Sequence, residues 1–154
     1  MNPKNILSLL LLLALTACDP NRVFDDNQAI NTAGWRYNET LNLAIPITDI
    51  APKYNIYINI RHKGDYEYNN LYLIFRVENP DKTAQTNRLN LHLANKQGKW
   101  FGTGLGDMYS TQILLKANQQ YTQKGIYTYS LSQYMRINQL KNVVNAGIRI
   151  EKAS

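Results

Sequence analysis

The chain has 154 residues, one cysteine and a formal net charge of +6. This length fits a single domain with a hydrophobic core, and one cysteine excludes a disulfide framework. Because the Lys and Arg residues are scattered without a basic block, we expect a solvated surface and no nucleic-acid partner.

The N-terminal segment has the three parts of a bacterial secretory signal. Lys4 gives it a positive start, and the apolar run from Ile6 to Leu15 is too short to span a bilayer. Small residues stand directly before Cys18, an arrangement known as the lipobox of bacterial lipoproteins. We therefore predict a signal peptide over residues 1–17 and lipidation of Cys18, whose acyl chains would anchor the protein to a membrane. The residues predicted to be recognised by the signal peptidase are Leu15, Thr16 and Ala17.

The next segment, residues 18–34, is predicted to be a lipidated polar tether. It shows no sustained apolar period, which is typical of a linker. Val23, Phe24 and Ile30 are its candidates for docking onto the folded domain, which we place at residues 35–154.

From Leu41 onward, apolar residues recur at every second position, which predicts half-buried strands. In one run Ile56, Ile58 and Ile60 share a face, so this face is expected to lie in the core. The strands predicted in this way are Leu41–Ile47, Asn55–His62, Leu71–Val77, Arg88–Ala94, Lys99–Gly102, Thr111–Ala117, Gly125–Leu131 and Ala146–Glu151.

About eight short strands separated by turns favour an all-β domain, since a single sheet would leave one apolar face in water. We predict a β-sandwich, with a jelly roll as one topology open to it. One helical segment is expected, from Ser132 to Leu140, where it could cap an open end of the sandwich.

Enzyme signatures are missing from the sequence. His62 and His92 are each assigned to the polar side of a strand, and no Ser or Asp motif accompanies them. The glycine-rich run from Gly102 to Asp107 lacks the strand-to-helix context of a phosphate-binding loop, so a turn explains it better. No metal-ligand spacing appears. We therefore expect a protein that is not an enzyme and that has no cofactor and no metal site.

Aromatic residues are the remaining signal, with eleven Tyr and two Trp. Such side chains suit a recognition surface for protein or sugar, although many would equally serve as strand residues. Trp100 and Phe101 are neighbours, so one is expected to face the core and the other the solvent. The residues predicted to bind a partner are Trp100, Phe101, Gly102, Gly104, Gly106 and Asp107. The alternative is that Trp100 is a core residue and the glycines shape a turn.

The sequence also resembles a known family, the gliding-motility lipoprotein GldH of the Bacteroidota. The resemblance is carried by the lipobox with Cys18–Phe24, Trp35, Asp49, Tyr54–Arg61, Tyr66–Tyr72, Gly98–Asp107, Gly125–Tyr127, Gln133–Arg136 and Val144–Glu151. It implies a non-enzymatic, lipid-anchored accessory or scaffold subunit of the gliding-motility and type IX secretion machinery. It also implies an outer-membrane location, partners among other gliding or secretion lipoproteins or envelope proteins, and no catalytic residue. The alternative function is a surface-associated carbohydrate-binding module.

Overall fold

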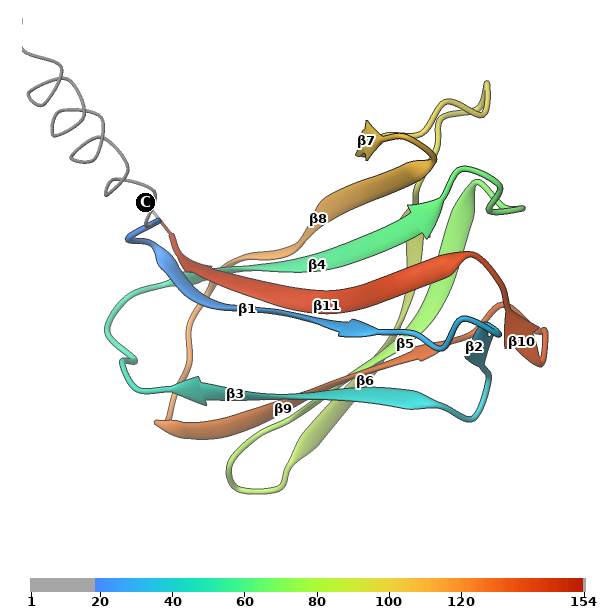
Figure 1. Cartoon of the computed structure of the whole chain (residues 1–154). Coiled ribbons are helices and arrows are strands. Elements are labelled where there is room, and N and C mark those ends of the chain that lie inside the picture. The colour runs from blue at the N-terminus through green and yellow to red at the C-terminus, as the bar shows by residue number, and fades with distance from the viewer. Residues whose placement is uncertain (1–18, 154) are drawn as a thin grey trace, which may run out of the picture.

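The computed structural model describes residues 19–153, and every regular element in this range is a β-strand (Figure 1). One sheet has five strands and a second sheet has four, while two short strands form a separate ribbon. The five-stranded sheet consists, in spatial order, of β1 (Arg22–Ala29), β11 (Val143–Lys152), β4 (Tyr54–Lys63), β8 (Met108–Gln119) and β7 (Thr103–Leu105). The four-stranded sheet consists of β3 (Thr40–Ile47), β9 (Gly125–Gln133), β5 (Asn70–Glu78) and β6 (Ala84–His92).

The two sheets form a β-sandwich with the strand order of a jelly roll, which confirms the predicted fold class. The antiparallel pairs are nested in sequence: β1 pairs with β11, β3 with β9, β4 with β8 and β5 with β6. Each pair outside the innermost one therefore joins distant parts of the chain. The chain therefore forms one long antiparallel hairpin that is folded around the core, which is the connectivity of a jelly roll.

The core lies between the sheets and is built by the alternation seen in the sequence. Ile56, Ile58 and Ile60 of β4 are all buried, and Leu71 and Leu73 of β5 are buried in the opposite sheet. Residues between them point outward, because successive side chains of a strand lie on opposite faces. The predicted inward face of β4 is thus confirmed.

A two-stranded ribbon closes one end of the sandwich. It pairs β2 (Trp35–Arg36) with β10 (Gln139–Leu140). Trp35 is fully buried, and its indole Nε1 donates a hydrogen bond to the carbonyl oxygen of Glu39 at 3.0 Å. The end of the sandwich assigned to a helix is therefore covered by this ribbon.

The predicted helix from Ser132 to Leu140 is wrong. Its first residues complete β9 and its last residues form β10. Arg136 has a φ of 59°, a left-handed conformation that a helix cannot contain. In its place the side chain of Gln133 accepts from the Met135 backbone N–H and donates to the Ile137 carbonyl oxygen, which organises an irregular turn.

The predicted tether is also too long. Residues 22–29 form β1, which pairs with β11 at the edge of the five-stranded sheet (Figure 1). Ile30 is buried, and Phe24 packs against the core. The edge is further held by Arg149 of β11, which forms ion pairs with two carboxylates of the N-terminal segment and with one of its own strand. Its three ion-pair partners are Asp19, Asp25 and Glu151.

The remaining differences concern strand bounds. Lys99–Gly102 is not a strand, and only Trp100 forms an isolated bridge, with Ala94. The strand predicted from Arg88 begins earlier, at Ala84, and ends at His92. The signal peptide, its recognition residues and Cys18 lie outside the described residues. Within residues 19–153, no helix has the length and apolar character needed to cross a membrane.

Candidate interaction surface

The segment from Leu93 to Asp107 projects from the sandwich as a hairpin and then a short edge strand (Figure 1). The hairpin is closed by the Phe101 backbone N–H, which donates to the Leu93 carbonyl oxygen at 2.9 Å. At its tip the side chain of Asn95 accepts from the backbone N–H groups of Gln97 and Lys99 at 3.0 and 2.9 Å. Asn commonly shapes turns in this way. The segment is thus an ordered extension of the fold.

Trp100 is the inward member of the aromatic pair. It is half-buried and packs against the edge of the core. Its ring centroid lies 4.5 Å from that of His62 and 6.0 Å from that of Tyr109. Tyr66 completes this cluster, with a centroid 5.6 Å from that of His62. We call Trp100, His62, Tyr66 and Tyr109 the aromatic cluster; it fastens the hairpin to β4 and β8.

His62 does not lie on the polar side of its strand as expected. It is fully buried, because it follows Ile56, Ile58 and Ile60 at the same two-residue spacing. Its Nδ1 donates to the Lys63 carbonyl oxygen at 2.8 Å, and its Nε2 has no partner among the described residues. Burial lowers the pKa of His62 despite the opposing effect of that hydrogen bond. His92, in contrast, is exposed as predicted.

Phe101 and Leu105 are the outward members of the segment. Phe101 is 58% exposed and Leu105 is 88% exposed. Leu105 belongs to β7, the last strand of its sheet, so the outer side of β7 has no neighbouring strand in the described chain. Large exposed apolar side chains beside a free strand edge are typical of a contact surface for another protein. We call Phe101, Leu105 and the free edge of β7 the β7 surface.

Glycine is needed at different positions of this segment for different structural reasons. A Cβ at Gly102 would lie 2.4 Å from the carbonyl oxygen of Ser110, so the residue before β7 lies too close to β8 for a side chain. Gly106 has a φ of 66°, which favours glycine in the tight turn between these strands. A Cβ at Gly104 would lie 2.9 Å from Cε1 of the Tyr109 ring. The Asp107 carbonyl oxygen accepts from the Gly64 N–H at 2.6 Å, which ties this turn to the end of β4.

The structure therefore divides the predicted partner-binding residues. Trp100, Gly102 and Gly104 are engaged with the protein's own β4 and β8, while Phe101 points to solvent. Leu105, the most exposed large apolar residue of the β7 surface, is not among the residues predicted from the sequence. Its position between two glycines on an edge strand was the available signal, since such a side chain has no neighbours to cover it.

A second group of exposed aromatics lies on the outer face of the four-stranded sheet. Tyr72 is 43% exposed and Tyr134 is 39% exposed, and the guanidinium carbon of Arg88 lies 5.1 Å from the ring centre of Tyr134. These residues line a shallow pocket of about 590 Å³ beside Asn70 and Asn90. Within residues 19–153, no three His, Cys, Asp or Glu side chains are grouped so as to hold a metal ion.

Fold and surface together define a class: a jelly-roll sandwich with an exposed apolar edge suited to macromolecular contact. The chain belongs to the GldH lipoprotein family, whose match extends over residues 22–150 and so spans the sandwich from β1 to β11.

Two curated relatives resemble the chain along nearly its whole length. It is 30% identical over 149 residues to the gliding motility lipoprotein GldH homolog of Christiangramia forsetii, with 92% of this chain and 91% of that protein covered. It is 29% identical over 151 residues to the gliding motility lipoprotein GldH of Flavobacterium johnsoniae, with 94% and 93% covered. No solved structure matches the chain significantly.

Proposed function

We propose that this protein is a non-enzymatic, lipid-anchored subunit of the cell envelope that serves gliding motility and type IX secretion. The observation that carries the proposal is its membership of the GldH lipoprotein family across the entire sandwich. Its two relatives are named for gliding motility. The role in secretion rests on the sequence resemblance, and the scaffold role agrees with a fold that offers a contact surface.

The anchor is assigned to Cys18, with signal-peptidase recognition at Leu15, Thr16 and Ala17, and to the outer membrane. Because β1 begins at Arg22, only a short connection joins Cys18 to the sandwich. The domain would therefore stand close to the lipid surface, since a few extended residues reach only ~3.5 Å each.

Replacing Cys18 by Ala tests the anchor. We expect Cys18→Ala to release the protein from the membrane fraction or to stall its export, and to impair gliding and secretion. Membrane fractionation, with an immunoblot of the outer membrane, measures the first effect. Mass spectrometry that finds an unmodified thiol on the mature Cys18 would contradict the assignment.

Partner docking is assigned to the β7 surface within the predicted segment Trp100, Phe101, Gly102, Gly104, Gly106 and Asp107. Exposed aromatic and aliphatic side chains supply most of the binding energy at such contacts. Trp100 is given the supporting role, because its ring packs in the aromatic cluster. The partner is expected to be another gliding or secretion lipoprotein, or an envelope protein.

Paired variants separate docking from folding. Phe101→Ser combined with Leu105→Ser should leave the melting temperature within about 3 °C and abolish co-purification with envelope partners. Trp100→Ala should instead lower the stability by up to ~3–5 kcal/mol. Tyr37→Ser, a change at an equally exposed aromatic on another part of the sandwich, is the matched control. Full co-purification by the double variant would remove the docking assignment.

A carbohydrate-binding module is the second candidate, and the exposed Tyr72 and Tyr134 favour it. Rings that are open on one face can stack on sugars, while the neighbouring Asn side chains can bond hydroxyl groups. Glycan-array binding that is lost in Tyr134→Ala and kept in Tyr37→Ala would support this candidate. An array without any binding would reject it.

A further inference from the structure

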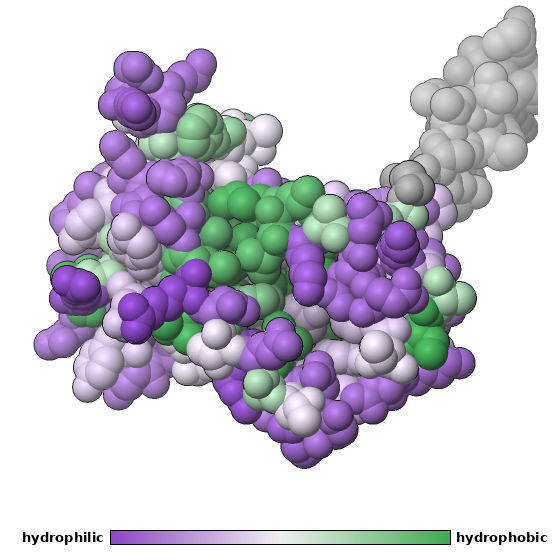
Figure 2. Space-filling model, turned by 180° about the vertical axis from the view of Figure 1, so that it is seen from behind, coloured by the Kyte–Doolittle hydropathy of each residue, from purple (hydrophilic) through white to green (hydrophobic). Residues whose placement is uncertain are grey.

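The two long edges of the sandwich are closed differently. β1 and β3 lie side by side at one edge, where Gln28 donates from Nε2 to the Asn42 carbonyl oxygen at 2.7 Å. At the opposite edge, β6 and β8 are the outermost long strands of their sheets, and a groove of about 660 Å³ opens between them. Figure 2 shows this side of the molecule, with hydrophobic side chains gathered in a hollow that polar residues surround. We call it the β6–β8 groove.

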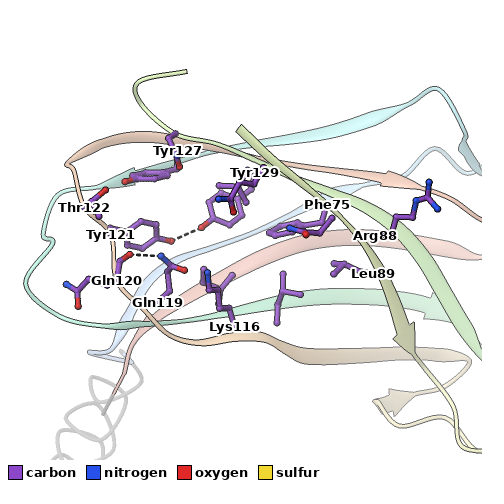
Figure 3. A pocket seen from close by; sticks show the side chains of 16 residues that line it. Phe75, Arg88, Leu89, Lys116, Gln119, Gln120, Tyr121, Thr122, Tyr127 and Tyr129 are labelled. Atoms are coloured by element: carbon purple, nitrogen blue, oxygen red, sulfur yellow. Dashed lines mark hydrogen bonds between the residues drawn. The ribbon is translucent and has the colours of Figure 1, made fainter. Parts of the chain in front are cut away.

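The floor of the groove is apolar and already packed. Phe75, Tyr121, Tyr127 and Tyr129 lie along it, each no more than 7% exposed (Figure 3). The hydroxyl groups of Tyr121 and Tyr129 bond each other at 2.7 Å. Burial raises the pKa of Tyr121 to about 12, so this pair is neutral at ordinary pH. Because the rings are covered and their hydroxyls are occupied, they offer no stacking platform for a sugar.

The β6 side of the groove has a regular backbone edge. β6 pairs with β5 over nine successive residue pairs without a shift in register, and its outer side has no strand in the described chain. Its sequence contains neither Pro nor Lys, two of the residues that protect exposed edges. An edge of this kind presents an unbroken row of N–H and C=O groups, which an added strand can pair with.

The β8 side is different. Its pairing with β4 is shifted in register on both sides of Ile56, and Lys116 lies there. Bulges and Lys side chains both prevent strand addition. β6 is therefore the edge that is open to a partner, and β8 forms the far wall of the groove.

Two residues on the inner face of β6 are polar amides. Gln85 and Asn87 lie opposite Val77 and Phe75 and face into the groove, and both are exposed. Their amides can both donate and accept, as the backbone of a peptide requires. A peptide offers partners to these amides and a simple acyl chain offers none, so they favour a peptide.

The charges of the groove favour an acidic ligand. Among the described residues, Lys116 and Arg88 are the only charged ones that line it, and the Arg88 guanidinium lies over Tyr134 on the outer face. The Lys116 side chain faces the groove (Figure 3), and no carboxylate of residues 19–153 lines it. An acidic side chain of a ligand would gain a charge-assisted bond there.

We propose that the β6–β8 groove binds an extended peptide segment of another protein, which pairs with β6 as a fifth strand of its sheet. Alternate apolar side chains of the segment enter the groove against Leu89, Leu115 and Phe75, and one carboxylate contacts Lys116. The site lies at the end of β8 remote from the β7 surface, and it does not depend on the docking assigned to that surface.

An array of ten-residue synthetic peptides tests this site with the full-length protein in detergent. Val or Leu alternates with Thr in each peptide, and one central polar position is Glu, Lys or Ser. We expect the Glu peptides to bind at least tenfold more tightly than the Lys peptides. Lys116→Glu should reverse this order, while Lys141→Glu, at an exposed site outside the groove, should not.

Hydrogen exchange of the protein's backbone amides, compared with and without the bound Glu peptide, is the second measurement. Amides of β6 should become protected, and those of β1 should be unchanged. Equal binding of all peptides, no binding, or binding without protection of β6 would overturn the proposal. The proposal would also be overturned if dodecanoate or an oligosaccharide displaced the peptides from the groove. The same holds if either of them bound in the groove and the peptides did not.

Discussion

The two long edges of this sandwich use similar strands for opposite purposes. At the β1–β3 edge the outermost strand is held by an ion cluster around Arg149 and by one side-chain hydrogen bond, from Gln28 to the other sheet. At the β6–β8 edge the inward residues of β6 are partly amides, and the space between the sheets stays open. The closed edge therefore contributes to folding, and the open edge is free for recognition.

Cavity-forming substitutions should distinguish these edges by the largest margin. Ile148 lies on β11 near the closed edge and is fully buried, whereas Leu89 on β6 is half-buried. Ile148→Ala should lower the free energy of unfolding by ~2–5 kcal/mol, and Leu89→Ala by roughly half as much, because less of its surface leaves water on folding. Urea denaturation measures both. Equal losses would show that the two edges are packed alike.

Removing the ion cluster should weaken the closed edge alone. The side chain of Arg149 is 16% exposed and bonds Asp25 at 3.0 Å and Glu151 at 2.5 Å, so Arg149→Met leaves these carboxylates facing one another. We expect the free energy of unfolding to fall by ~1–3 kcal/mol. Hydrogen exchange should become faster in β1 and stay unchanged in β6. An unchanged exchange rate in β1 would contradict its role as a strand that depends on this cluster.

The glycines beside the β7 surface should separate close packing from turn geometry. Gly102→Ala places a methyl group against the Ser110 carbonyl oxygen, and we expect a loss of ~1–3 kcal/mol. Gly106→Ala has open space around it and only its positive φ to oppose it, so a loss of ~1 kcal/mol is expected. Thermal unfolding of both variants shows which substitution costs more stability. A larger loss for Gly106→Ala than for Gly102→Ala would refute the stated reasons.

Acidification should give the smallest effect, and it should act on the aromatic cluster. Because the folded-state pKa of His62 is lowered below 6.5, the unfolded chain binds its proton first as the pH falls. Stability is therefore fully present above pH 6.5 and declines below it, toward the lowered pKa. His62→Phe should remove this component between pH 7 and pH 5, and His92→Phe should retain it. Melting curves across this pH range make the comparison.

Much of the sandwich was predictable because the alternation of apolar residues within a strand shows which face of that strand is buried. Alternation at Ile56, Ile58 and Ile60 places β4, and the same rule extended by one step would have placed His62 inside. β1 lacks such a pattern, since only Phe24 and Gln28 are partly covered in it. Its position depends on pairing with β11, a partner at the far end of the chain, which local periodicity does not report.

The segment that forms the interaction surface was predictable from the sequence. Which of its side chains face outward was not. Alternation around Trp100 and Phe101 requires one of them to face inward, and only the positions of His62 and Tyr109 decide which. Leu105 and the β6–β8 groove depend on which edges stay unpaired. That property belongs to the order of strands in the sheets, and strands adjacent in a sheet are here mostly distant in sequence.

Site-specific photocrosslinking in the native envelope tests most directly the claim that exposed edges serve recognition. A photoreactive phenylalanine analogue is placed at Phe101 or Leu105 on the β7 surface, and at Tyr37 or Ile126 as exposed controls elsewhere. Positions 101 and 105 are expected to yield a discrete crosslinked envelope protein, and the controls are expected to yield none. Absence of crosslinks at 101 and 105, or equal crosslinks at all four positions, would contradict that claim.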